Sequence, residues 1–252
     1  MKDSIILKSP DEIESMRRSS LVVAEVLQYL RDKVKPGATT LDLERLAEAE
    51  TKRLGARPAF KGYRGYPFCL CTSVNNEIVH GMPSARKLLK DGDILSIDFG
   101  VLLDGFYGDA AITVAVGNIG DEPERLMRVT EASLYDAIEM ARPGNRLSDI
   151  SAAVQSRVEA EGFSVVRDFV GHGIGRSLHE APQVPNFGIP GRGVRLKAGM
   201  VLAIEPMINL GGYGVRVLED GWTAVTSDGS LSAHFEHTVA ITEDGPYVLS
   251  RP

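Results

Sequence analysis

The sequence predicts an α+β fold built from two similar halves, in which helices are followed by an antiparallel sheet that they cover. Three observations lead to this prediction: an internal repeat, the same order of helical and strand-like segments in each half, and short turns between the strands. A chain of 252 residues, 43% of them hydrophobic, can bury about 70 to 75% of its unfolded surface. We therefore expect one domain over residues 1–252.

The internal repeat has an offset of 107 residues. KDGDILSID at 90–98 matches KAGMVLAIE at 197–205, and the match carries Asp98 onto Glu205, since 98 and 205 differ by 107. KPG at 35–37 and RPG at 142–144 have the same separation. This shared offset predicts two related parts, at approximately residues 10–117 and 123–242.

Each half begins with two segments of helical character. Residues 10–33 and 123–141 have helical composition and lead into KPG and RPG, where Pro and Gly stop a helix. Residues 40–54 and 147–161 then carry apolar residues at helical spacing. We expect a helix over each of these four ranges.

Strand-like runs follow the helices. They lie at 94–99, 109–116, 200–205, 214–218 and 235–241. The Asp-Gly pair at 104–105 predicts a two-residue hairpin turn, which places Asp98 opposite Ala111 and Asp109 diagonally across from Asp98. Short turns of this kind imply mainly antiparallel pairing.

Composition excludes several classes of protein. The formal charge of −6 gives no nucleic-acid footprint, and no apolar run approaches the 18 or so residues that a membrane span needs. The first eighteen residues mix charges and lack the apolar region of a secretory signal, so we expect a cytoplasmic protein. Cys69 and Cys71 are too few for a closed zinc site and are expected to be buried in a strand, where each could line a pocket.

Four carboxylates occur on the strand-like runs. They are those of Asp98, Asp109, Glu205 and Glu236. With a period of two, the neighbour of each acid on its own face of the strand is small: Ser96, Ala111, Ala203 and Thr238. The opposite faces carry Leu, Ile, Val and Phe. We predict a sheet with one apolar face under the helices and one hollow, acidic face.

Bound cations best explain four converging acids. Ionised carboxylates repel one another and are costly to bury unless they are paired. Lys or Arg partners are the structural alternative, but these strands carry no adjacent base. Two divalent ions would neutralise four carboxylates, and the sequence therefore predicts a metal centre.

A fifth ligand is predicted in GHGIGRSLHEAP, residues 171–182. Glycines on both sides of His172 disfavour a helix, so we expect a loop that presents His172 closely to the metal. His179 is expected further off, free to contact substrate. His237 points to the other face of its strand than Glu236, and we exclude it.

These residues, with HGMP at 80–83, GHGIG at 171–175, HEAP at 179–182 and IEPM at 204–207, resemble the methionine aminopeptidases, most closely the short bacterial type I form. The resemblance spans essentially the whole chain. It implies the pseudo-symmetric pita-bread fold and removal of the N-terminal methionine from nascent polypeptides. It also implies that the five residues named above hold two divalent metal ions: Asp98, Asp109, His172, Glu205 and Glu236.

The resemblance also implies a mechanism. An oxygen-rich site of this kind suits Mn, Fe, Co or Zn. A hydroxide that bridges the two ions would attack the peptide carbonyl, while Glu205 passes a proton to the leaving amine. His179 would stabilise the tetrahedral intermediate, and His80 would orient substrate or donate a proton.

The family's pocket positions match residues that would otherwise be read as core. They are Phe60, Tyr63, Tyr66, Cys71, Leu178 and Trp222, with His80, His179 and Met207 nearby. Phe60 stands where many relatives have Cys, Leu178 where Phe is common, and Arg64 where His is common, so we expect a pocket of altered shape. The resemblance extends to a monovalent cation site at Asn75, Glu77 and Ser232.

Two other functions share these motifs. Prolidases and Xaa-Pro aminopeptidases have the same ligand set but usually carry an additional N-terminal domain, for which the residues before Asp98 leave little room. Non-catalytic pita-bread modules that bind peptides typically lose metal ligands. We expect a monomeric enzyme that acts on chains beginning with Met and a small second residue, with the ribosome as a further partner.

Overall fold

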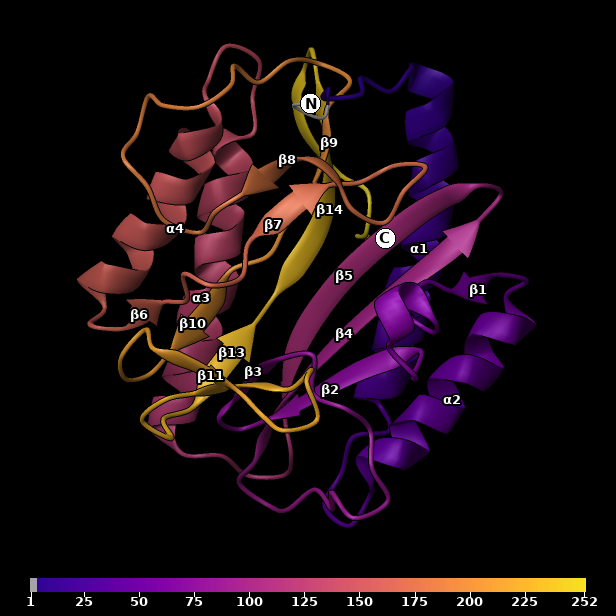
Figure 1. Cartoon of the computed structure of the whole chain (residues 1–252), viewed down its shortest axis with the longest axis vertical. Helices are drawn as coiled ribbons and strands as arrows, with labels where there is room; N and C mark the ends of the chain where they lie inside the picture. Colours follow the sequence, from indigo (N-terminus) through magenta and orange to yellow (C-terminus); the bar gives the residue numbers. More distant parts are fainter. Residues whose placement is uncertain (1–3) are drawn as a thin grey trace.

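Helices cover one face of a central sheet in the computed structural model, which describes residues 4–252 (Figure 1). The helices are α1 (Pro10–Arg31), α2 (Thr40–Arg53), α3 (Asp121–Met140) and α4 (Leu147–Ala160), with a 3-10 turn at Tyr63–Gly65. All four predicted helices are confirmed, with small differences at their ends. Capping boxes explain two of the starts, since Ser9 pairs with Glu12 at α1 and Thr39 with Asp42 at α2.

The central sheet has nine strands. Its strands are β1 (Arg57–Pro58), β2 (Leu70–Val74), β4 (Ile94–Leu103), β5 (Phe106–Ala115), β7 (Gly171–Gly173), β8 (Glu180–Val184), β9 (Val201–Ile204), β14 (Glu236–Thr242) and β15 (Gly245–Val248). The main order is β1-β4-β5-β14-β9-β7-β8, with β2 on β4 and β15 on β14. Every pair in it is antiparallel, as predicted.

Two smaller sheets flank the central one. The first joins β6 (Ser164–Val165), β10 (Met207–Asn209) and β13 (Ser232–His234), and the second joins β3 (Glu77–Val79), β11 (Val215–Val217) and β12 (Ala224–Thr226). Both are also antiparallel. The pattern in the sequence indicated only β11 of these strands, because runs of two or three residues carry little periodicity.

The two parts of the chain are built alike. Helix α2 begins at Thr40 and α4 at Leu147, and strands β4 and β9 begin at Ile94 and Val201. Each pair of positions differs by 107, the offset of the sequence repeat. Strands β5 and β14 adjoin at the centre of the sheet, so Asp98 on β4 and Glu205 after β9 approach from opposite sides.

The β4–β5 hairpin has the predicted register. Asp104 and Gly105 have φ angles of 51° and 81°, the left-handed values that a two-residue turn needs. Asp98 pairs with Ala111, and Asp109 lies opposite Gly100, diagonally across from Asp98. The strands are longer than predicted, because the pairing continues to the turn.

The prediction of a loop around His172 is wrong. Residues Gly171–Gly173 form β7, which pairs with β8 and β9. A Cβ at Gly171 would collide with the carbonyl oxygen of Ala203, and one at Gly173 with that of Ala181. Only glycine fits at these two positions, because the neighbouring strands approach closely. This packing explains why glycine stands in a strand although its strand propensity is low.

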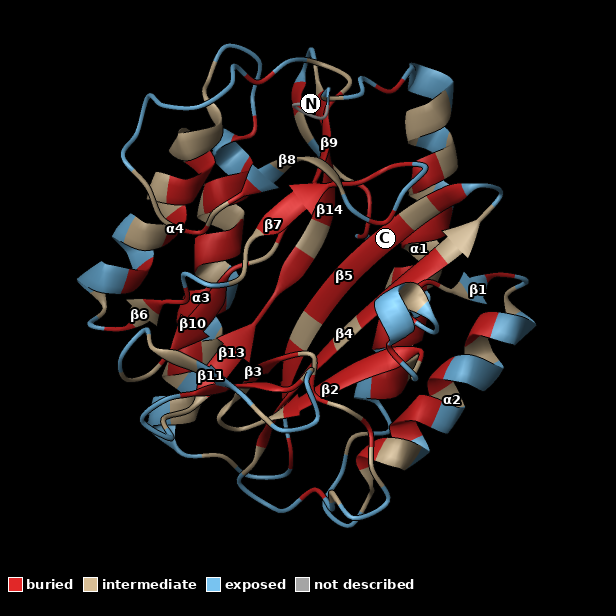
Figure 2. Ribbon diagram, viewed as in Figure 1, coloured by how far each residue is buried: buried red, intermediate tan, exposed pale blue. Residues whose placement is uncertain are grey.

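Two apolar clusters lie between the sheet and the helices. Leu95, Ile97 and Phe99 of β4 pack in the cluster beneath α1 and α2, and a second cluster lies beneath α3 and α4. Figure 2 shows buried residues along the central strands and on the helix faces turned toward them. The prediction of one apolar and one acidic face is confirmed, since the acidic cavity opens on the side away from these clusters. No helix within residues 4–252 is long and apolar enough to cross a membrane.

Candidate metal centre and substrate cavity

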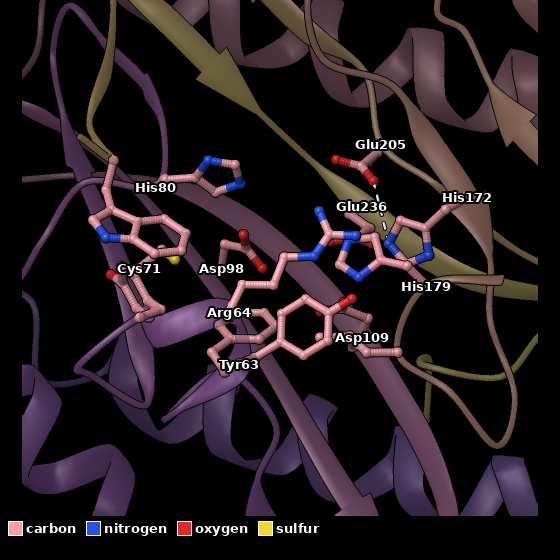
Figure 3. Close-up of a pocket in the computed structure, with 14 residues that line it drawn as sticks. Tyr63, Arg64, Cys71, His80, Asp98, Asp109, His172, His179, Glu205 and Glu236 are labelled. Atoms are coloured by element: carbon pink, nitrogen blue, oxygen red, sulfur yellow. Dashed lines mark ion pairs between the residues drawn. The ribbon is translucent and has the colours of Figure 1, made fainter. Parts of the chain in front are cut away.

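A cavity of about 140 Å³ lies on the acidic face of the sheet. Its lining contains every residue predicted as a metal ligand or as a pocket residue, together with Arg64: Phe60, Tyr63, Arg64, Tyr66, Cys71, His80, Asp98, Asp109, His172, Leu178, His179, Glu205, Trp222 and Glu236. Figure 3 shows Asp109, Glu205, Glu236 and His172 at one end, His80 and Cys71 toward the other, and Asp98 between them. Met207 is fully buried in a different cluster, beside Val79 and Val166.

The acidic end has the geometry of a metal site. Asp109 on β5, His172 on β7 and Glu236 on β14 each offer a ligand atom, and these atoms lie within 4.8 Å of one another. Glu205 joins them, with its Oε1 3.6 Å from His172 Nε2. Asp98 stands diagonally across the hairpin from Asp109.

Several carboxylate oxygens of this site have no hydrogen-bond partner, which leaves them free to bind cations. Within the described part of the chain, Asp98 Oδ1, Asp109 Oδ1 and Glu236 Oε1 are buried without a hydrogen-bond partner. Orphaned buried oxygens are rare and indicate a missing ion or water. No Lys or Arg nitrogen of residues 4–252 lies within 4.0 Å of the four carboxylates, so basic side chains do not neutralise them.

The backbones behind these acids are fixed. Thr238 on β14 donates its hydroxyl to the carbonyl oxygen of Asp109 at 2.7 Å, and accepts the Asp109 N–H at 3.1 Å. The carbonyl oxygen of Glu205 accepts a hydrogen bond from the Asn186 amide at 3.0 Å. The carboxylates are thus held on rigid elements, as a preorganised site requires.

Burial and mutual repulsion favour the protonated form of each acid. Burial raises the pKa of Asp98 to about 7. Burial, reinforced by the charge of Asp98, raises the pKa values of Asp109 and Glu205 well above their ordinary values. Burial, reinforced by the charges of Asp109 and Glu205, does the same for the pKa of Glu236. A dication in the cavity would reverse this preference, because its charge stabilises the ionised ligands.

Burial favours the neutral form of the histidines in the cavity. Burial lowers the pKa of His172 to about 4, and partial burial with the adjoining His172 and Arg64 lowers that of His179 to about 3. The two rings have centroids only 4.1 Å apart, closer than the predicted loop implied, because β7 and β8 are paired and the chain turns tightly between them. A neutral imidazole can ligate a metal or donate one N–H.

The other end of the cavity is aromatic. Tyr66 and Trp222 meet edge to face with centroids 5.1 Å apart, and Tyr63 stacks on His179 at 5.2 Å. Cys71 on β2 is buried here as a free thiol, and burial raises its pKa. An aromatic and apolar lining of this kind suits one apolar side chain of a substrate.

His80 is held in a strained backbone conformation. Its φ of 59° is uncommon for a residue other than glycine, and its ring packs edge-on against Phe169 at 5.4 Å. Strain of this kind persists only where the surrounding structure enforces it, and it clusters at functional sites. The geometry therefore supports the predicted role of His80 as a residue that contacts substrate.

One residue of the site was missed from the sequence. His234 is 1% exposed, its Nε2 lies 3.7 Å from Glu205 Oε2, and neither ring nitrogen has a partner within residues 4–252. Glu205 is thus bracketed by the imidazoles of His172 and His234. The signal was present in HFEH, because His234 stands two positions before Glu236, the spacing that shares one face of a strand.

The predicted monovalent cation site is already hydrogen-bonded. The Asn75 carbonyl accepts the Ser232 N–H at 2.8 Å, and Lys87 Nζ binds the Glu77 carboxylate at 2.7 Å. Each backbone carbonyl keeps a second lone pair. Asn75, Glu77 and Ser232 lie close together, and a cation there stays a prediction.

The free energy of unfolding of the chelated protein is expected to fall by roughly 1 to 4 kcal/mol between pH 6.5 and 8. Carboxyls whose folded pKa is raised stabilise the fold at low pH, and this contribution is lost as the pH rises through about 7 for Asp98 and higher for the other acids. Histidines with lowered folded pKa have the opposite effect, but only below their unfolded pKa near 6.5. Urea unfolding in chelator at both pH values measures the difference.

Saturating Mn²⁺ provides the control, because a bound ion removes the preference for protonated acids. The fall should then disappear. A free energy of unfolding that is constant or rises with pH in the chelated protein contradicts the assignment of these carboxyls as buried and unpaired.

The chain resembles known metallopeptidases over almost its whole length. The model of metallopeptidase family M24 matches residues 14–243. A methionine aminopeptidase of Clostridium perfringens is 58% identical over 98% of both chains. The crystal structure of a methionine aminopeptidase from Thermotoga maritima superposes with a TM-score of 0.97 and 51% identity, over 99% of this chain and 100% of that one.

A more distant structure shares only the fold. A prolidase from Pyrococcus furiosus has a TM-score of 0.78 at 22% identity, and the match covers 98% of this chain but 66% of the prolidase. The predicted pita-bread architecture is confirmed by both sets of neighbours.

Proposed function

Because this chain belongs to metallopeptidase family M24, we infer that its acidic cavity is the active site of a methionine aminopeptidase, a metal-dependent hydrolase. One observation supports this inference above all others. Buried carboxylates with orphaned oxygens line one end of a cavity of about 140 Å³, and aromatic and apolar side chains line its other end. The acidic end of the cavity suits cations, and the aromatic end suits a methionine side chain.

Five residues fit a pair of divalent metal ions. They are Asp98, Asp109, His172, Glu205 and Glu236. Such ions, when bound, polarise a carbonyl oxygen and lower the pKa of a water molecule. We propose two ions drawn from Mn, Fe, Co or Zn, because four carboxylates and one imidazole make an oxygen-rich donor set.

Glu205 is the best placed of the acids to move a proton. Its two oxygens lie 3.6 Å and 3.7 Å from the imidazoles of His172 and His234. In the metal-free protein, burial and the nearby acids Asp98 and Asp109 raise its pKa. We propose that Glu205 takes the proton of the attacking water and delivers it to the leaving amine.

The two remaining histidines act on the substrate. His179 is neutral, exposed at the cavity and stacked on Tyr63, which leaves an N–H to stabilise the charge that develops on the carbonyl oxygen. His80 lies between Phe169 and Trp222, where it can orient the peptide.

The aromatic end holds the methionine side chain in this proposal. Phe60, Tyr66 and Leu178 are buried in one cluster that borders the acidic end. Arg64 lines the cavity, is exposed and lies 5.4 Å from the Tyr63 ring centroid. A small second residue on the substrate, ribosome contact, a monomeric state and a cytoplasmic location stay predictions.

Met-Ala-Ser is expected to be cleaved after Met, while an Ala-Pro dipeptide is not. The measurement is product formation after chelation and add-back of each divalent metal in turn, with elemental analysis of the purified protein. Turnover without any metal would refute a metal centre. Preference for Ala-Pro would favour the prolidase alternative, and binding of Met-Ala-Ser without turnover would favour a non-catalytic module.

A further inference from the structure

A buried ion pair joins the N-terminal segment (Ser4–Ser9) to the active site. Lys8 Nζ lies 2.5 Å from Glu180 Oε2, and the two side chains are only 4% and 7% exposed. Glu180 directly follows His179 in the chain. Burying a charge is costly unless it is paired, so each of these side chains depends on the other.

The Glu180 carboxylate also holds the turn that carries His179. Its second oxygen accepts the Ser177 N–H at 3.2 Å, and Gly175 donates to the Ser177 carbonyl at 3.1 Å. We call residues 175–179 the His179 turn. One carboxylate therefore binds both Lys8 and the backbone of this turn.

Position 175, the last glycine of GHGIG, has no room for a side chain, because Lys8 fills the adjoining space. A Cβ on Gly175 would stand 2.5 Å from Lys8 Cε and 2.7 Å from Glu180 Oε1. The Lys8 stem passes through the space that a side chain would occupy. Lys8 itself is anchored, because its N–H donates to the Gly199 carbonyl at 2.7 Å and its Nζ to that of Ile6 at 3.0 Å.

The His179 ring needs such support. No group among residues 4–252 forms a hydrogen bond with it, and its fixed neighbours are the rings of Tyr63 and His172. The backbone of the His179 turn consequently sets where its N–H points. A shift of about 1 Å in a group that stabilises a transition state can cost roughly 10²-fold in rate.

We propose that Lys8 is a positioning residue for His179, acting through Glu180 and the His179 turn. This inference rests on the proposed function of His179 in peptide hydrolysis. It gives the N-terminal segment a part in the reaction although that segment does not line the cavity.

Lys8→Met is the first test, since methionine matches the lysine stem in size and lacks the charge. In the Mn²⁺-loaded enzyme, kcat on Met-Ala-Ser should fall about 10- to 100-fold, with KM changed less than about 2-fold. Metal affinity, measured by calorimetry, should stay unchanged. In a His179→Ala background, Lys8→Met should cause no further fall in kcat, because the two act as a unit.

A second variant separates positioning from stability. Lys8→Met/Glu180→Gln leaves no unpaired buried charge and should regain most of the thermal stability lost in Lys8→Met. Its kcat should stay low, because the tie to the N-terminal segment is still absent. Val154→Ala, in the core beneath α3 and α4, is the control for lost stability and should keep the wild-type kcat.

Histidine ring NMR tests the inference without activity. The chain has five histidines, and only the resonances of His179 and its neighbour His172 should move in Lys8→Met, while His237 behind the sheet stays in place. An unmoved His179 resonance in Lys8→Met overturns the proposal. So does a fall in kcat on Lys8→Met that is equally large with His179 and in the His179→Ala background, and so does a Lys8→Met/Glu180→Gln variant that recovers kcat together with stability. If the wild-type enzyme itself fails to cleave Met-Ala-Ser, the proposed function fails, whereas the spectra still decide whether Lys8 positions His179.

Discussion

Asp109→Asn is expected to abolish both metal binding and peptide hydrolysis. Asp109 is 4% exposed, and its carboxylate stands within 4.8 Å of ligand atoms on His172 and Glu236. The amide keeps the shape of the side chain but removes one negative charge from the donor set. Since loss of a hydrogen-bond partner of a ligand already costs about 10- to 100-fold in metal affinity, loss of a ligand should cost more.

The measurement is metal content after dialysis together with kcat/KM on Met-Ala-Ser. Asp104→Asn is the matched control: the same chemical change five residues away, at the exposed turn of the same hairpin, where asparagine tolerates the φ of 51°. That control should keep full metal content and activity. Asp109→Asn protein that retains both would refute the metal centre as assigned here.

His179→Ala is expected to lower kcat by about 10² or more while both metal content and KM change little. The His179 ring adjoins that of His172, a proposed ligand, but His179 is not itself a proposed ligand, so alanine should remove only an N–H donor. Because partial burial, with the adjoining His172 and Arg64, lowers the pKa of His179 to about 3, the loss should be the same from pH 6 to 8. Single-turnover kinetics over this range measure it.

His179→Gln supplies the chemical control, since its amide can donate a hydrogen bond from a similar position. It should regain part of the lost kcat. Unchanged turnover in His179→Ala would remove this residue from the mechanism, and loss of metal would make it a ligand instead of a donor to the substrate.

Local chemistry made the β4–β5 hairpin predictable. The Asp104-Gly105 turn and strict alternation along the strands determined the register, and with it the shared face of Asp98 and Asp109. The exclusion of His237 follows from the same alternation, and the structure places this side chain beside Tyr135 and Ser250, away from the cavity. Each of these features depends on residues a few positions apart.

Long-range packing made other features unpredictable. Strand β7 is rich in glycine and forms only because β8 and β9 lie on either side of it. The same limit hid the place of His234 beside Glu205, although the spacing in HFEH was readable. No local pattern could have joined Lys8 to Glu180, which are 172 residues apart.

The sequence by itself determined the four helices, the hairpin, the acidic face of the sheet and the kind of residues that a metal centre would use. The tertiary structure alone decided which of those residues meet, how close His172 and His179 lie, and how the N-terminal segment reaches the active site. The physical reason is the distance along the chain over which each interaction acts. Turn geometry and side-chain alternation act within a few residues, whereas distances between segments exist only once the sheet has closed and its helices have packed.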